Sequence, residues 1–262
     1  MYNNSIKITA ASLLIAVSLT LPFISFAQTA TTTTGSGANF CSRLPVVSAN
    51  LQKSITDRIA NLTQYQTNVT TNIQTRRAKT DSDLKADRTT AEARLQDQFA
   101  KLTQKATTSS EQQAVQTFEA TINSAVTAHV QAIDTAGQTF RTAEDGVIST
   151  HQSAVMSAVT SFQSSVNAAI TQANSNCSSG MAPATARQTF TGSVSSARSA
   201  LKSSEQQIAK AAPQIQSLIQ TRQQSVQLAN ATFKSAVSQA DQTLKLAFPN
   251  PTTSSTTTTP AQ

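Results

Sequence analysis

The sequence has no tryptophan, and cysteine, histidine and glycine are also scarce. Among 262 residues there are 2 cysteines, 2 histidines, 6 glycines and 7 prolines. So few turn residues argue against a β-sandwich or a β-barrel, because those folds need one about every ten positions. The rare histidines and cysteines leave little material for a metal or thiol enzyme. The net charge of +7 is modest and the apolar residues are regularly spaced, which argues against disorder.

Residues 1–27 are predicted to form a secretory signal peptide. One cation, Lys7, precedes a long uncharged run, and small residues stand at Ser25 and Ala27, just before a predicted cleavage site. This arrangement is typical of a cleaved signal. The alternative is an uncleaved anchor, because the uncharged run is long enough to span a bilayer. We expect an exported chain, secreted, periplasmic or at the cell surface, with no stable membrane insertion after cleavage.

The two cysteines, Cys41 and Cys177, are predicted to form a disulfide. Export would place them in an oxidising compartment, where such bonds persist. Two cysteines allow only one pairing within the chain. Two free thiols or a bond between chains remain the alternatives.

Apolar residues recur every eleven positions, whereas steps of seven meet polar and charged side chains. Steps of eleven through the first half give Leu51, Leu62, Ile73, Leu84, Leu95 and Ala106. A second block begins at Ala114, and a third, less regular block follows. An eleven-residue (hendecad) period predicts long amphipathic helices with a straight or right-handed supercoil.

Start and stop signals divide these blocks into three helices. Pro45 is predicted to open the first, Thr108 and Glu111 form a capping box before the second, and Pro183 suits the first turn of the third. The expected helices cover about 46–106, 111–175 and 183–247. At 1.5 Å per residue, each would be roughly 90–100 Å long.

The predicted fold class is all-α, an elongated antiparallel three-helix bundle or coiled coil over residues 45–248. Near-equal helices joined by short breaks favour this arrangement. The cysteines agree with it, because their midpoint falls in the first break, so a chain that reverses there brings them together. Residues 28–44 are predicted to be a Thr-rich flexible linker, and 249–262 a disordered tail rich in Thr and Pro.

Antiparallel pairing also predicts neighbours across the helices. Residues whose numbers sum to about 218 should be level across the first turn, which places Arg77 near Glu144. Both charges stand in apolar columns, and a buried charge needs a partner, so we predict a buried ion pair.

Across the second turn, the level residues have numbers that sum to about 360. This relation places Pro213 near Gly146. Together with Gly137 these residues predict a kinked, loosened layer, because glycine and proline weaken helices.

No pattern typical of catalysis is found. The two histidines, His129 and His151, are 22 positions apart, some 33 Å along a helix, so they cannot hold one ion within it. A pH-sensitive packing role is the alternative for them. The mature chain has no nucleophile elbow, and no glycine-rich phosphate loop is present. We therefore expect no enzyme activity, no cofactor and no metal site.

The leading hypothesis is an exported, non-enzymatic helical rod. It would act as a structural spacer or protein-interaction module at or outside the cell envelope, with an unknown protein or an envelope polymer as partner. One alternative is a surface-active amphipathic helical protein that binds lipid or unfolded clients. Another is a binder of acidic cell-wall polymers, given the basic net charge. Basic residues are scattered without interleaved aromatics, so no nucleic-acid partner is predicted. The oligomeric state stays open.

Overall fold

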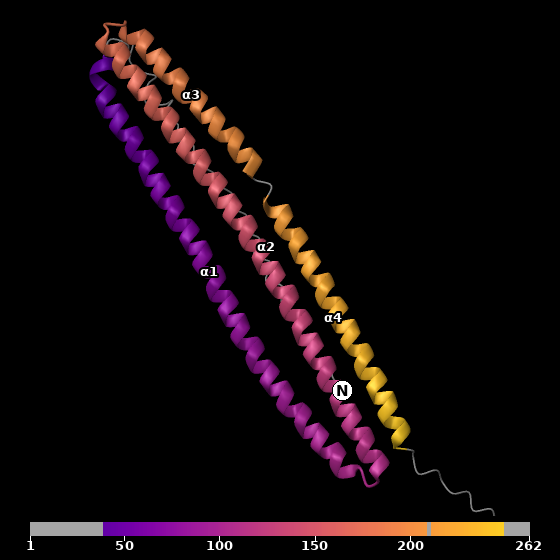
Figure 1. Cartoon of the computed structure of the whole chain (residues 1–262). Helices are drawn as coiled ribbons and strands as arrows, with labels where there is room; N and C mark the ends of the chain where they lie inside the picture. Colours follow the sequence, from indigo (N-terminus) through magenta and orange to yellow (C-terminus); the bar gives the residue numbers. More distant parts are fainter. Residues whose placement is uncertain (1–38, 209–210, 249–262) are drawn as a thin grey trace, which may run out of the picture. The chain divides into compact units, whose positions relative to one another are not determined.

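The computed structural model describes residues 39–208 and 211–248. These residues form four helices and no strand, so the predicted all-α class is confirmed (Figure 1). Within them, no helix combines the length and hydropathy that a membrane span requires. The helices are α1 (Phe40–Lys105), α2 (Ser109–Ser178), α3 (Pro183–Ile208) and α4 (Ala211–Ala247).

Three predictions concern residues outside the described part of the chain. The signal peptide over 1–27 lies outside it, as do residues 28–38 of the expected linker and the tail over 249–262. Each of these stays a prediction.

The described chain divides into two compact units. Unit 1 contains residues 39–69 and 144–217, apart from 209–210, and unit 2 contains 70–143 and 218–248. Unit 1 therefore holds the start of α1, the end of α2, all of α3 and the first turns of α4. Unit 2 holds the rest of α1, α2 and α4. Each is a helical bundle with its own buried residues.

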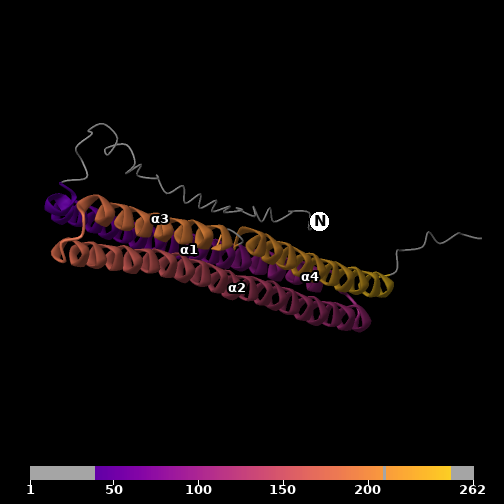
Figure 2. The same ribbon diagram turned by 90° about the horizontal axis from the view of Figure 1, so that it is seen from above.

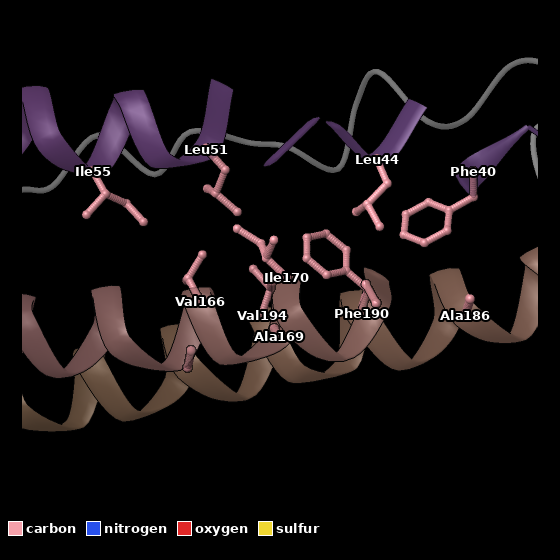
Figure 3. Packing of buried hydrophobic residues seen from close by; sticks show 12 residues of the cluster. Phe40, Leu44, Leu51, Ile55, Val166, Ala169, Ile170, Ala186, Phe190 and Val194 are labelled. Carbon is pink, nitrogen blue, oxygen red and sulfur yellow. The ribbon is translucent and has the colours of Figure 1, made fainter. Parts of the chain in front are cut away.

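The core of unit 1 is assembled from three helices. Within this unit, α3 lies beside α1 and α2 (Figure 2). Leu51 and Ile55 of α1 point toward the side chains that rise from α2 and α3, among them Val166 (Figure 3). Leu44 and Val166 are almost completely buried, and the rings of Phe40 and Phe190 pack 5.8 Å apart between their centroids. A smaller cluster contains Leu62, Val155 and Val159.

Unit 2 has smaller cores, grouped toward the turn between α1 and α2. Phe99 of α1, Ile122 of α2 and Ala240 of α4 form one cluster. Val115 and Leu244 belong to a second, closer to the turn. Three helices therefore contribute to each cluster.

Helix α1 begins earlier than predicted. It starts at Phe40, so residues 40–44 are helical and do not belong to a linker, and Pro45 lies inside the helix. Pro45 has no N–H to donate to the carbonyl one turn back, which weakens the first turns. Burial of Phe40 and Leu44 in the core of unit 1 offsets that loss. Burial of these side chains therefore outweighs the missing hydrogen bond at Pro45.

The turn between α1 and α2 contains the predicted capping box, which is confirmed. Thr108 Oγ1 accepts a hydrogen bond from the backbone N–H of Glu111, at 3.2 Å. Glu111 Oε2 in return accepts from the N–H groups of Thr107 and Thr108, at 2.8 and 2.9 Å. These bonds satisfy N–H groups that the first turn of a helix leaves without a partner. They also hold the pKa of Glu111 below its usual value.

Helix α2 ends in a Schellman motif. Gly180 has a φ of +79°, a left-handed conformation that costs glycine little. The N–H of Met181 donates to the carbonyl of Asn176, and the N–H of Gly180 donates to the carbonyl of Cys177, at 3.1 and 3.3 Å. The same motif therefore ends the helix and fixes the backbone of Cys177.

The third predicted helix is two helices in the structure. The expected span of 183–247 corresponds to α3, which ends at Ile208, and α4, which begins at Ala211; residues 209–210 between them lie outside the described part of the chain. As the third residue of α4, Pro213 occupies a first turn, where proline is tolerated.

Helices α1 and α2 are antiparallel within each unit. In unit 1, Gln52 Nε2 donates to Asn167 Oδ1 at 3.2 Å, and Gln66 Nε2 donates to the carbonyl of Gln152 at 3.2 Å. A step forward along α1 therefore corresponds to a step backward along α2, as the sequence predicts for these positions.

Candidate functional site

The disulfide between Cys41 and Cys177 joins α1 to α2 in unit 1, as predicted. The two Cα atoms lie 5.6 Å apart across a sequence separation of 136 residues. Both cysteines are partly buried and pack against the main core of the unit. The covalent link therefore closes a long loop directly beside the largest apolar cluster.

Two arginine–aspartate pairs join α1 to α2 in unit 2, and we call them the Arg–Asp clasps. Arg141 donates to both carboxylate oxygens of Asp81, at 2.6 and 2.8 Å. Arg88 donates to both oxygens of Asp134, at 2.5 and 3.0 Å. The Asp81 side chain is 53% exposed, so each pair is a surface interaction of modest strength, although its bidentate geometry is favourable.

The clasps lie where the apolar core is absent. No residue of α1 between Leu62 and Phe99 is buried, and none of α2 between Ile122 and Val155 is buried. In unit 2, both clasps fall inside these stretches. The hydrogen bond from Arg141 holds the pKa of Asp81 below its usual value, with smaller contributions from Arg141, Arg77 and Arg88 as charges.

The predicted ion pair between Arg77 and Glu144 stays a prediction. Both residues are half-buried, so the burial expected for them is only partial. Long charged side chains can cover apolar surface with their stems while the charged end stays hydrated, which explains partial burial in an apolar column. Arg77 belongs to unit 2 and Glu144 to unit 1.

The predicted kink residues differ from one another in the structure. Gly137 is half-buried and Gly146 exposed, and both lie within α2, which runs without a break. A Cβ atom at either glycine would meet no atom within 4 Å, so neither is needed for close packing. Pro213 lies in the first turn of α4. The loosened layer that these three residues would share stays a prediction.

His129 joins α2 to α4 in unit 2. Its Nε2 forms a 2.8 Å hydrogen bond with Asn230 Oδ1, and its ring lies 4.9 Å from the ring of Phe233 between centroids. Farther along, the guanidinium of Arg222 lies 5.3 Å from the centre of the Phe140 ring, a cation–π contact. Polar and aromatic contacts thus hold this part of α4.

His151 lies in unit 1, where burial lowers the pKa of its imidazole. The cause is desolvation, which disfavours the charged ring. The same effect raises the pKa of Glu205, against an opposing influence from the nearby Arg58. These shifts describe partly buried groups within the bundle and define no catalytic pair.

The described residues offer no enclosed chemical site. Among them, no group of three or more histidine, cysteine or acidic side chains could hold a metal ion. One open groove is lined by Gln66 of α1 and by hydroxyl, amide and thioether side chains of α2. Another lies over the Arg88 clasp and is lined by Leu84, Lys85 and neighbouring charged residues. Most residues that line the two grooves have polar side chains.

Comparison of the chain with protein-family models, with curated protein sequences and with solved structures gives no match. A functional proposal therefore depends on the chain's own residues.

Sequence reasoning missed the Arg–Asp clasps. The available signal was an acidic residue followed seven positions later by a basic one on α1, with the same order on the antiparallel α2.

Proposed function

We propose that this chain is an exported, non-enzymatic helical rod, an antiparallel three-helix bundle with an eleven-residue repeat. It would serve as a structural spacer or as a protein-interaction module at or outside the cell envelope. The observation that supports this most is the Cys41–Cys177 disulfide. Such a bond persists in oxidising compartments and is rare in reducing ones.

The distribution of side chains also favours a spacer. The helices bury small and branched residues, while serine, threonine and glutamine cover much of the exposed surface. Exposed threonine hydroxyls bond to carbonyls one turn earlier in their own helix, as in Thr63 to Ile59 and Thr121 to Thr117. A surface of this kind is hydrated and carries few charged side chains, which suits a module that separates or presents other parts.

Two measurements test the proposal. The full-length chain is expressed with its native N-terminus, and the exported fraction is mapped by non-reducing peptide mass spectrometry. The proposal expects an exported protein with Cys41 linked to Cys177 and a scattering envelope roughly 100 Å long. An intracellular protein with free thiols, or a compact particle, would contradict it. The matched control is the Cys41→Ser/Cys177→Ser variant, which should be exported without the linked peptide.

A surface-active role is the second candidate, and one observation favours it. Between their buried ends, α1 and α2 keep apolar residues such as Ile73 and Leu84 only half-buried. A bundle closed this loosely could expose apolar faces to lipid or to an unfolded client. Flotation with neutral and anionic liposomes separates the candidates, because a spacer should stay in the bottom fraction with both. Strong flotation would favour the surface-active role instead.

A further inference from the structure

The first turn of α1 is attached to the rest of unit 1 by burial and by a covalent bond. This turn consists of residues 40–44, and we call it the latch. Two of its side chains, Phe40 and Leu44, are buried in the core of the unit, and the Phe40 ring packs against Phe190 of α3 (Figure 3). The third attachment is the disulfide of Cys41, which ties the latch to α2.

A proline weakens the connection between the latch and the rest of α1. Pro45 follows the latch directly and lies inside the helix. In a regular helix the carbonyl of Cys41 accepts a hydrogen bond from the N–H of residue 45, but proline has no N–H and its ring clashes with that carbonyl. The interruption of the backbone pattern therefore falls at the same cysteine that carries the disulfide.

Burial alone is a weak restraint on so short a segment. Five backbone residues must be held in one conformation, and each one costs conformational entropy. Burial of Phe40 and Leu44 offsets the hydrogen bond that Pro45 lacks, but two side chains return less free energy than the ordering of five residues costs. The disulfide lowers that cost, because it keeps the latch beside α2 even when the turn opens. The closed latch therefore depends on the covalent bond.

We propose that the latch is a redox-controlled cover of the unit 1 core, closed while Cys41 and Cys177 are bonded and open after their reduction. Both cysteines are partly exposed, so a small dithiol can reach them. A thiolate of the dithiol attacks the sulfur of one cysteine, and the other cysteine leaves as a thiolate and takes up a proton. The second thiol of the reductant then displaces the first cysteine and closes the reductant's own disulfide. The latch separates at Pro45 and uncovers Phe190, while the rest of α1 in unit 1 stays helical.

Tryptic cleavage after Arg43 measures the opening, because Arg43 is exposed and lies within the latch, and a helical bond is cut only after it opens locally. The purified full-length chain is digested oxidised, or reduced with dithiothreitol that is removed under nitrogen before trypsin is added. Each rate is divided by the rate for the same bond in the unfolded chain. In the oxidised chain, cleavage after Arg43, Lys53 and Arg58 should be at least about a hundredfold slower than in the unfolded chain. After reduction, only cleavage after Arg43 should come within about tenfold of the unfolded rate.

Two variants separate the roles of the proline and the disulfide. Alanine in Pro45→Ala restores the N–H that bonds to the carbonyl of Cys41 and removes the ring clash. Reduced Pro45→Ala should therefore be cleaved after Arg43 about tenfold more slowly than the reduced wild type, relative to the unfolded rates. Cys41→Ser/Cys177→Ser should be cleaved like the reduced wild type without any treatment, and dithiothreitol should not change its rate.

Three results would overturn the proposal. Equal protection of the bond after Arg43 before and after reduction would mean that burial alone holds the latch closed. Cleavage after Lys53 and Arg58 at the unfolded rate in the reduced chain would mean that the disulfide holds the whole unit and not one turn. Reduced Pro45→Ala that is cleaved as fast as the reduced wild type would mean that the latch does not separate at the proline.

Discussion

Unit 1 and unit 2 contain parts of the same two helices, α1 and α2, yet different interactions hold each unit together. Among the described residues, fifteen of the 22 buried hydrophobic ones belong to unit 1, which also contains the disulfide. Unit 2 has the other seven, together with the Arg–Asp clasps and the capping box. Apolar burial and a covalent link dominate one unit, while charges and hydrogen bonds contribute more in the other.

This difference indicates how stability can vary along helices that two units share. Burial contributes roughly 25 cal/mol per Å² of apolar surface, whereas an exposed ion pair contributes about 1 kcal/mol or less. Unit 2 is therefore expected to open locally more readily than unit 1. Hydrogen exchange resolved by segment measures this directly and provides the readout for the variants below.

Removal of the disulfide should have the largest effect. The Cys41→Ser/Cys177→Ser variant loses a link that closes a loop across 136 residues. Chain-entropy arguments give a loss of about 4–5 kcal/mol for a loop of this size. Denaturant unfolding should show the lower stability, and exchange should rise first in unit 1. Reductant should lower the stability of the wild type and leave the variant unchanged; equal sensitivity of both would refute this account.

Truncation of the unit 1 core should come next. Leu44 is 1% exposed, so Leu44→Ala should lower the free energy of unfolding by about 2–4 kcal/mol through lost burial and a cavity. The measurement is chemical denaturation combined with exchange in 40–60. A loss below about 1 kcal/mol would mean that this core is less important than its burial indicates.

Two control variants accompany that truncation. Leu246→Ala removes a side chain that is 84% exposed and should change stability by less than about 0.5 kcal/mol. Ser48→Ala changes a residue in the buried part of α1 whose hydroxyl has no hydrogen-bond partner within the described residues. Its loss should not lower stability, because an unsatisfied buried hydroxyl is itself unfavourable.

A variant of the helix cap in the turn between α1 and α2 tests the contribution of that turn to the stability of unit 2. Thr108→Ala removes the acceptor for the N–H of Glu111 and should cost about 1 kcal/mol. Faster hydrogen exchange in the first turns of α2 would show this loss of stability. Ser110→Ala is the matched control, since Ser110 is an exposed residue in the first turn of α2. Equal effects of the two variants would contradict the assignment of Thr108 as the cap.

Local sequence signals predicted much of this architecture. The capping box and the start of α3 at Pro183 each depend on neighbours within a few residues, and both are found. The cysteine pairing could also be anticipated, because only one pairing exists within the chain. Features that depend on a single turn of backbone could therefore be predicted from the residue types.

Features that depend on tertiary context were harder to predict. Pro45 was read as a helix start, but packing of Leu44 extends α1 beyond it. The bidentate pairs of Arg141 with Asp81 and of Arg88 with Asp134 were not anticipated either. The length and the tilt of each side chain decide which charged residues pair across two helices. Positions along the sequence alone give neither.

The smallest effect expected is a pH dependence in unit 1 from His151. Burial lowers the pKa of its imidazole below the usual 6.5, so the unfolded chain binds the proton more readily than the folded one. This contribution is complete above pH 6.5 and is lost as the pH falls below that value. The loss should stay below about 1 kcal/mol, because the ring is partly exposed and screened by water.

Stability measured between pH 7 and 5 in wild type and His151→Gln tests this sign. The wild type should lose stability in unit 1 over that range, and the variant should lose less, because glutamine does not titrate. His129→Gln provides the matched control, since His129 lies in unit 2 and the pH dependence of unit 1 should persist without it. An identical pH profile in wild type and His151→Gln would show that the buried ring contributes nothing. A profile that persisted would have to come from other groups of the unit, with Glu205 excluded by sign, since its raised pKa favours the fold as the pH falls.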